Sequence, residues 1–122
     1  MSIANLLIIF LGVTLNAFGQ LFLKSGANII GPITSESSFL QIMSSAVNLY
    51  IILGLISYAL SISAWVVALS RVDVSIAYPM LSFGYVIVTI AAWILFNEPI
   101  SLIKVIALSV IIFGIILLGL AG

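Results

Sequence analysis

Two side-chain amides and a lysine follow one another at helical spacing in the first apolar run of the chain. Asn16, Gln20 and Lys24 are four residues apart, so they lie on one face of a helix together with Gly12 and Gly19. An amide near the centre of a membrane helix must meet another helix, a polar ligand or water, because lipid offers it no hydrogen bond. Two interpretations stay open. The amides tie this helix to a neighbour, or they line a polar cleft that ends at the Lys24 ammonium, which suits a phosphate.

Hydroxyl groups mark one face of the third apolar run. Tyr78, Ser82, Tyr85 and Thr89 follow one another at spacings of four, three and four residues. Pro79 removes a backbone hydrogen bond and clashes with the preceding turn, so we expect a kink or a loosened first turn there. Such a stripe suits a sugar or a lipid headgroup. The alternative is an aromatic belt at the membrane surface with some tolerated hydroxyls.

Charged residues are few and are expected at or beyond the ends of the apolar runs. They are Lys24, Glu36, Arg71, Asp73, Glu98 and Lys104. Glu98 is either a solvated loop carboxylate or a group that meets an ammonium or positions Lys104. Arg71 and Asp73 are expected to anchor and cap a helix start, although Arg71 also suits a phosphate at the opposite membrane face.

The composition excludes most other classes of protein. Of the 122 residues 65% are hydrophobic and 5% are charged, and the net charge is zero. Soluble domains have about 25% charged residues, and nucleic-acid binding needs a basic field that this chain lacks. The chain has no Cys and no His, and no nucleophile–base pair, metal-ligand cluster or phosphate-binding glycine loop is visible, so we expect neither an enzyme nor a cofactor. An integral membrane protein remains.

Four apolar runs are long enough to cross a membrane as helices. They span residues 3–23, 49–69, 75–96 and 102–120, against the roughly 20 residues that a crossing requires. The short turns at 70–74 and 97–101 force neighbouring helices to be antiparallel. The expected fold is an all-α integral membrane protein, a single domain over residues 1–122 in which four transmembrane helices form a bundle.

The first connection is longer and contains helix signals of its own. Gly31-Pro32 ends the first helix, and Ser38 with Gln41 has the spacing of a capping box. Apolar side chains then fall on one side of residues 39–47, and polar ones, Ser45 among them, fall mostly on the other. This pattern predicts a short helix in the headgroup layer. An ordinary loop is the alternative.

Four tightly connected helices are expected to leave no room for a substrate path, so transport would require a second chain. Many transporters place their site between two inverted repeats, and a four-helix chain supplies only one of them. Ala107, Gly114 and Ala121 repeat every seven residues along the fourth run, which predicts an interface for the second chain. The alternative is that small residues are simply frequent in membrane helices.

The third run also carries a family signature. Val74–Ser82, with the sequence VSIAYPMLS, and the NEP at 97–99 resemble the small-multidrug-resistance-like branch of the drug/metabolite transporter superfamily. Together with Gly19-Gln20 and Lys24, these motifs are most similar to the aminoarabinose–undecaprenyl-phosphate flippase subunits. The resemblance implies four helices, an antiparallel homodimer or paired heterodimer, the bacterial inner membrane, and a lipid-linked sugar phosphate as substrate.

Drug-exporting members of that superfamily have a carboxylate in the middle of the first span, where it exchanges protons for cationic substrates. The matching position here is Asn16, which cannot release a proton, so proton-coupled drug export is disfavoured. By motif position the resemblance assigns Lys24, Tyr78, Ser82 and Glu98 as candidate contacts.

These observations predict a transporter subunit that moves a polar, lipid-linked headgroup between leaflets. The contacts expected at the phosphate are Lys24 and Arg71, and those expected around the sugar are Asn16, Gln20, Tyr78, Ser82 and Tyr85. Two alternatives stay open. One is a secondary exporter of small cations or metabolites that titrates Glu98, and the other is a non-transporting membrane scaffold subunit.

Overall fold

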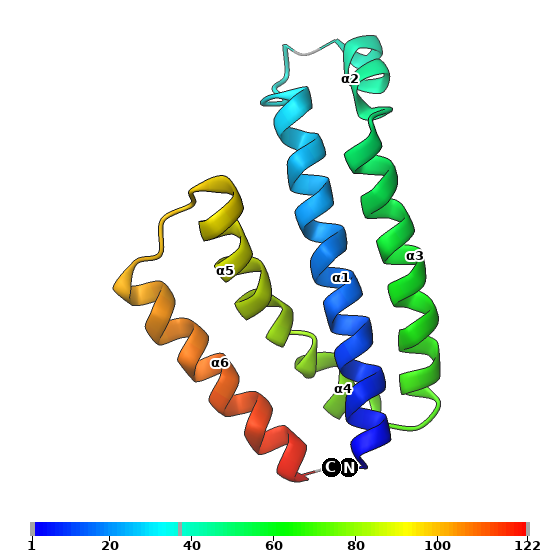
Figure 1. Ribbon diagram of the computed structural model, residues 1–122, viewed down its shortest axis with the longest axis vertical. Coiled ribbons are helices and arrows are strands. Elements are labelled where there is room, and N and C mark those ends of the chain that lie inside the picture. Colours follow the sequence, from blue (N-terminus) through cyan, green and yellow to red (C-terminus); the bar gives the residue numbers. More distant parts are fainter. Residues whose placement is uncertain (1, 37, 122) are drawn as a thin grey trace.

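Helices make up most of the computed structural model of the chain, which describes residues 2–36 and 38–121 (Figure 1). In chain order they are α1 (Ile3–Ile30), α2 (Phe39–Ala46), α3 (Leu49–Leu69), α4 (Val74–Met80), α5 (Phe83–Phe96) and α6 (Leu102–Ala121). By length and composition α1, α3, the α4–α5 segment and α6 can each cross a membrane. The expected all-α membrane architecture with four spans and a short helix in the first loop is confirmed.

Helix α1 is longer than expected, so Lys24 lies inside a helix and not at its end. The helix continues to Ile30 and is closed by Gly31, which has a φ of +82° and donates its N–H to the carbonyl of Ala27. The apolar span is expected to end at residue 23, but the helix continues through Lys24 to the predicted break at Gly31 and Pro32, because a lysine does not interrupt a helix. At 1.5 Å per residue α1 extends about 42 Å, more than the roughly 30 Å of a bilayer's hydrocarbon core.

The two expected cap residues occupy the predicted positions. Ser38 is the N-cap of α2 and Asp73 is the N-cap of α4, but neither side chain makes the capping hydrogen bond. The reciprocal capping box expected at Ser38 is therefore not formed. The side chain of Ser45 lies outside the part of the chain that the structure describes.

Helices α1 and α3 pack side by side along their length (Figure 1). Gly12, Gly19 and Gly26 are seven residues apart on α1 and face Trp65, Tyr58 and Ile51 of α3, respectively. A β-carbon at Gly12 would lie 3.0 Å from the Trp65 indole nitrogen, so only glycine permits this approach without adjustment. The buried Ser61 hydroxyl donates a hydrogen bond of 3.0 Å to the Gly12 carbonyl and ties the two helices together.

The third span is interrupted near its proline, but the interruption follows Pro79 and does not fall in the first turn, where loosening is expected. Between α4 and α5, the Leu81 N–H donates to the Tyr78 carbonyl and the Ser82 N–H donates to the Pro79 carbonyl, both at 3.0 Å. These bonds join residues three apart, which is the tighter 3₁₀ pattern. Pro79 has no N–H and its ring crowds the preceding turn, yet α4 continues through it to Met80, so the break lies after the proline and not in the turn where the lost bond acts.

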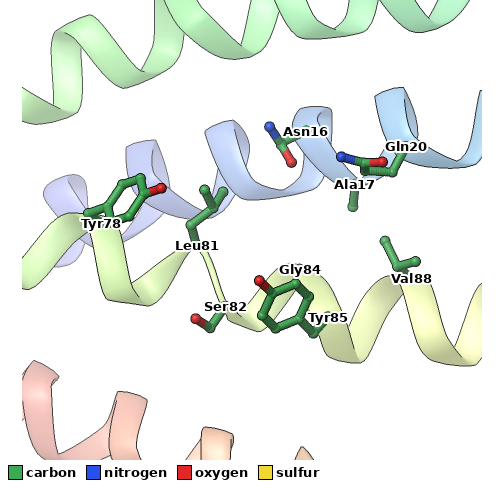
Figure 2. Close-up of a pocket in the computed structure, with 9 residues that line it drawn as sticks. All are labelled: Asn16, Ala17, Gln20, Tyr78, Leu81, Ser82, Gly84, Tyr85 and Val88. Carbon is green, nitrogen blue, oxygen red and sulfur yellow. The ribbon is translucent and has the colours of Figure 1, made fainter. Parts of the chain in front are cut away.

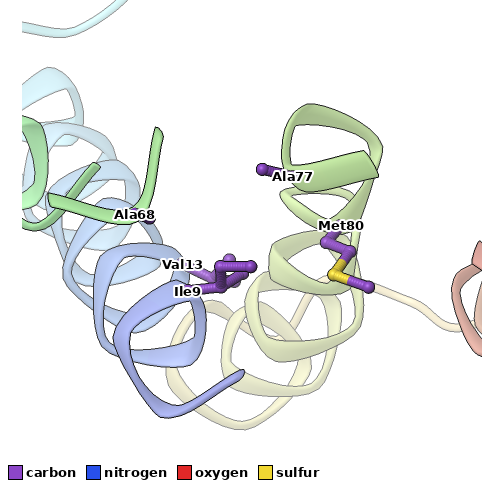
Figure 3. Packing of buried hydrophobic residues seen from close by; sticks show 5 residues of the cluster. All are labelled: Ile9, Val13, Ala68, Ala77 and Met80. Carbon is purple, nitrogen blue, oxygen red and sulfur yellow. The ribbon is translucent and has the colours of Figure 1, made fainter. Parts of the chain in front are cut away.

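A small hydrophobic core forms where α1, α3 and α4 meet. Its buried members are Ile9, Val13, Ala68, Ala77 and Met80 (Figure 3). Helix α6 touches this core through Ile115 and Leu118, but none of its described residues is buried. In Figure 1, α5 and α6 diverge from the α1–α3 pair towards the α5–α6 loop.

Candidate functional site

A cavity of about 470 Å³ lies between α1 and the broken third span, and we call it the polar cavity. Its lining is Asn16, Ala17 and Gln20 from α1, and Tyr78, Leu81, Ser82, Gly84, Tyr85 and Val88 from the third span (Figure 2). The chain leaves space between α1 and α5 because α5 diverges from α1 and because Ala17 and Gly84 fill little of the space between them.

Five of the eight residues singled out from the sequence line this cavity. Asn16 and Gln20 are one turn apart on α1, and Tyr78, Ser82 and Tyr85 come from the two sides of the break in the third span. Figure 2 shows Asn16 on α1 opposite the break. The tight turn at Leu81 and Ser82 brings hydroxyls from both α4 and α5 to one space.

The amides do not tie α1 to its neighbours. Within residues 2–36 and 38–121, neither Asn16 nor Gln20 makes a side-chain hydrogen bond, and neither do the hydroxyls of Tyr78, Ser82 and Tyr85. The helix-linking role is performed instead by Ser61. The polar cavity therefore presents unpartnered donors and acceptors to whatever enters it.

Lys24 lies beyond the polar cavity and lines a separate one. Two turns after Asn16 on α1, and thus about 12 Å along the helix axis, it borders a space of about 410 Å³ with Asn28 and Pro32. We call this space the Lys24 cavity. It lies towards the end of α1 that leads into the first loop, so the ammonium and the amides share a helix but not a cavity.

Arg71, in the α3–α4 turn, and Glu98, in the α5–α6 loop, also lie outside the polar cavity. Figure 1 shows these two connections at opposite ends of the helices. Arg71 is exposed in the α3–α4 turn, where its N–H donates to the Ala68 carbonyl at 3.0 Å. Glu98 is half-buried in the α5–α6 loop. The Lys104 ammonium donates to the Pro99 carbonyl at 2.8 Å, so Glu98 is not what positions it.

The lining of the polar cavity is electrically neutral. Its polar side chains are two amides, two phenols and one aliphatic hydroxyl, which donate and accept hydrogen bonds. No carboxylate, lysine or arginine lines it, and the described residues contain no cluster of three potential metal ligands among His, Cys, Asp and Glu. Such a surface can replace water around hydroxyl groups, and no carboxylate is present to exchange a proton.

Some features of the site are not visible in the residue spacing. Thr89, the last member of the expected hydroxyl stripe, does not line the cavity, and beyond Tyr85 the α5 lining continues with Val88 instead. Leu81 and Val88 supply apolar lining that no pattern in the sequence singled out. The seven-residue repeat of glycines in α1 was a readable signal for the α1–α3 contact.

Comparison with known proteins agrees with this architecture. The model of the EamA-like transporter family matches residues 29–120. The probable 4-amino-4-deoxy-L-arabinose-phosphoundecaprenol flippase subunit ArnF of Shewanella sediminis (strain HAW-EB3) is 34% identical over 95% of this chain and 88% of its own. The subunit of the same name from Enterobacter sp. (strain 638) is 35% identical over 88% of this chain and 87% of its own.

A second type of subunit is also similar. The probable flippase subunit ArnE of Pseudomonas aeruginosa (strain UCBPP-PA14), named for the same lipid, is 40% identical over 55% of this chain and 58% of its own. No solved structure matches the chain. With a family model that covers most of its length and four helices suited to crossing a membrane, this multi-pass protein belongs to the EamA-like transporter family.

Proposed function

We propose that this chain is one subunit of a flippase that moves the polar headgroup of a lipid-linked sugar phosphate between the leaflets of the bacterial inner membrane. One observation carries the proposal: neutral amides and hydroxyls without protein partners face a single space midway along membrane-crossing helices. The relatives named as flippase subunits for 4-amino-4-deoxy-L-arabinose-phosphoundecaprenol support this class of cargo.

The polar cavity suits a sugar because it offers several hydrogen bonds without a fixed charge. A sugar hydroxyl that leaves water without a new partner loses about 1–3 kcal/mol. Asn16 and Gln20 each provide a donor and an acceptor, and Tyr78, Ser82 and Tyr85 each provide a hydroxyl. The headgroup can then cross the apolar layer with its hydrogen bonds replaced, while its hydrocarbon chain stays in lipid.

The phosphate of such a cargo needs a cation at the membrane surface. Lys24 lies about 12 Å along the α1 axis from Asn16 and borders the Lys24 cavity. Arg71 lies at the opposite end of the helices (Figure 1). In the proposed cycle Lys24 holds the phosphate at one surface and Arg71 attracts it at the other.

A second chain completes the proposed transporter, as an antiparallel homodimer or a paired heterodimer. Helix α6 has no buried residue in the described part of the chain, and no atom comes within 4 Å of the place where a β-carbon at Gly114 would lie. Such a surface is suited to close packing against another membrane helix. The relatives' names, which distinguish ArnE from ArnF subunits, support the heterodimer as one form.

Leaflet exchange in reconstituted vesicles tests the proposal. The protein is inserted into vesicles of phosphatidylcholine and phosphatidylglycerol that contain 4-amino-4-deoxy-L-arabinose-phosphoundecaprenol, and the sugar amine is labelled from outside with a membrane-impermeant reagent. We expect all of the amine to become reactive with the protein present, and only the outer-leaflet fraction without it. An inner fraction that stays protected although the protein is a folded dimer would refute the proposal.

Two substitutions connect exchange to the polar cavity. Asn16→Leu keeps the side-chain volume and removes both hydrogen-bonding groups, so the loss of about 1–3 kcal/mol predicts exchange slower by roughly 5- to 150-fold. Tyr78→Phe removes one hydroxyl and should slow exchange by about fivefold. The controls are Thr89→Val and Tyr50→Phe, each of which removes a hydroxyl outside the cavity. Wild-type rates in both cavity variants would favour the scaffold role instead.

A further inference from the structure

A second, apolar space adjoins the polar cavity on the α3 side of Asn16. It measures about 300 Å³ and lies between α1, α3 and α4, and we call it the apolar groove. Asn16, Tyr78 and Leu81 line both spaces. The two spaces therefore meet at these three residues, with amides and hydroxyls on one side of the junction and hydrocarbon on the other.

Aromatic and branched side chains form the walls of the apolar groove. Tyr58, Ile62, Trp65 and Val66 line it from α3, and Val74 lines it from the start of α4. Ile62, Val66 and Val74 are each more than 60% exposed, so the groove opens outwards on a surface that faces lipid in a membrane. It is not a closed void left by imperfect packing.

From this arrangement we propose that the apolar groove holds the first isoprene units of the transported lipid while its headgroup occupies the polar cavity. The inference rests on the proposed function and adds a second subsite to it. An amphipathic lipid has one point where its polar part joins its chain, and the junction at Asn16, Tyr78 and Leu81 matches that point. A groove of about 300 Å³ is at the lower end of ligand-site volumes, so it holds only the segment next to the phosphate.

The groove contributes alignment more than affinity. A hydrocarbon chain that leaves the bilayer for the groove exchanges one apolar surrounding for another, so no hydrophobic driving force favours the transfer. Its fit against Trp65, which packs on Gly12 of the rigid α1–α3 pair, instead fixes where the chain enters. The headgroup is thereby directed to Asn16. This role predicts selectivity for the branched polyprenyl chain over a straight acyl chain.

Narrowing the groove tests the proposal through transport. Val66→Phe adds bulk at the groove wall, whereas Val67→Phe adds the same bulk at the next position of α3, outside the groove. Both side chains are exposed, so both variants should fold, which elution as a dimer verifies. We expect exchange of the polyprenyl lipid to fall by about tenfold in Val66→Phe, a loss near 1.4 kcal/mol, and to be unchanged in Val67→Phe. Equal rates in the two variants would overturn the proposal.

Fluorescence tests occupancy without requiring transport. The Trp93→Phe protein retains only Trp65, and a bilayer of brominated phosphatidylcholine should quench it. We expect undecaprenyl phosphate to relieve this quenching at a concentration about tenfold lower than dioleoyl phosphatidic acid, which carries a phosphate on straight chains. The Trp65→Phe protein, which retains Trp93 on α5, should show no relief.

Each other outcome overturns the proposal and identifies the true occupant. Equal relief by phosphatidic acid means that any lipid chain enters the groove, and a Trp65 that is never quenched means that a second copy of the chain covers it. The two proposals also fail separately. If undecaprenyl phosphate selectively relieves the quenching of Trp65 but no leaflet exchange occurs, the groove proposal is supported and the flippase proposal is refuted. If leaflet exchange occurs without selective relief of the quenching, the flippase proposal is supported and the groove proposal is refuted.

Discussion

Replacing Gly19 by alanine tests whether α1 and α3 pack through their glycines. A β-carbon at Gly19 would lie 3.1 Å from two ring atoms of Tyr58 and 3.3 Å from the carbonyl oxygen of Gly54. The tyrosine ring can shift, but the carbonyl belongs to the backbone of α3, so the two helices must move apart. Such overpacking costs about 1–3 kcal/mol, while the higher helix propensity of alanine returns about 1 kcal/mol. We expect the free energy of unfolding to fall by up to about 2 kcal/mol.

The matched control is Gly114→Ala in the middle of α6. It makes the same change of helix propensity, but no atom lies within 4 Å of the new β-carbon, so we expect a gain of about 1 kcal/mol. Unfolding of both variants by sodium dodecyl sulfate, in mixed micelles that hold the protein monomeric, is followed by circular dichroism. The two free energies should differ by the overpacking cost of about 1–3 kcal/mol. If Gly19→Ala stabilises the protein as much as Gly114→Ala does, the close approach of α1 and α3 is refuted.

Further predictions concern the helix contact, the phosphate, the loop carboxylate and the second chain. Ser61→Ala removes the buried bond to the Gly12 carbonyl and should lower the free energy of unfolding in the same assay by about 0.6–1 kcal/mol; an unchanged value would show that this bond contributes nothing. Lys24→Ala removes a charge-assisted hydrogen bond of about 1.5–3 kcal/mol and should slow lipid exchange by at least roughly tenfold, whereas Lys24→Arg should not. Glu98→Gln should leave lipid exchange unchanged, because Glu98 lies outside the polar cavity. For the same reason the wild-type protein should release no proton when cargo is added. Proton release by the wild-type protein that disappears in Glu98→Gln would favour the cation exporter. Gly114→Leu should abolish cross-linking between two chains in membranes while the unfolding of the monomer changes little, since its surroundings are open; retained cross-linking would remove α6 from the interface.

The membrane spans and most of the polar cavity could be predicted from the sequence because they depend on local patterns. An apolar run of sufficient length forms a helix in lipid whatever surrounds it, since the backbone must satisfy its own hydrogen bonds. Likewise, spacings of four residues along α1 place Asn16 and Gln20 on adjacent turns without any knowledge of the neighbours. Pro79 favours an interruption of the third span for an equally local reason, although the break itself follows at Leu81 and Ser82.

Contacts between distant parts of the chain could not be predicted in this way. The sequence grouped Gly12 and Gly19 with the amides on one face of α1, but the structure divides that face. The glycines pack against α3, while Asn16 and Gln20 border the polar cavity. The orientation of α1 relative to two neighbours decides this division, and no spacing along α1 encodes it.

The last turns of α1, up to the predicted break at Gly31, also pack against a distant part of the chain. Nothing in the apolar pattern extends the span beyond residue 23, yet Ile51 of α3 packs against Gly26, and the Asn48 side chain, which accepts a hydrogen bond from the Ile51 N–H, starts α3 beside it. The partner helix thus supports the last turns of α1 and places Lys24 within a helix. A loop lysine would be free to turn away, whereas a helical one is held at a fixed position on α1.

The division of α1 between two neighbours also indicates which wall of the polar cavity can move. On the α3 side, α1 is held by three glycine contacts and by the buried bond from Ser61. On the other side, the third span is interrupted at Leu81 and Ser82, where only bonds between residues three apart continue the chain, and α6 behind it has no buried residue in the described part. Fewer packed contacts lower the free energy of local rearrangement. A cargo that needs a wider cavity would therefore displace α5 and α6, while Asn16 stays fixed to the α1–α3 pair and provides the constant end of the site.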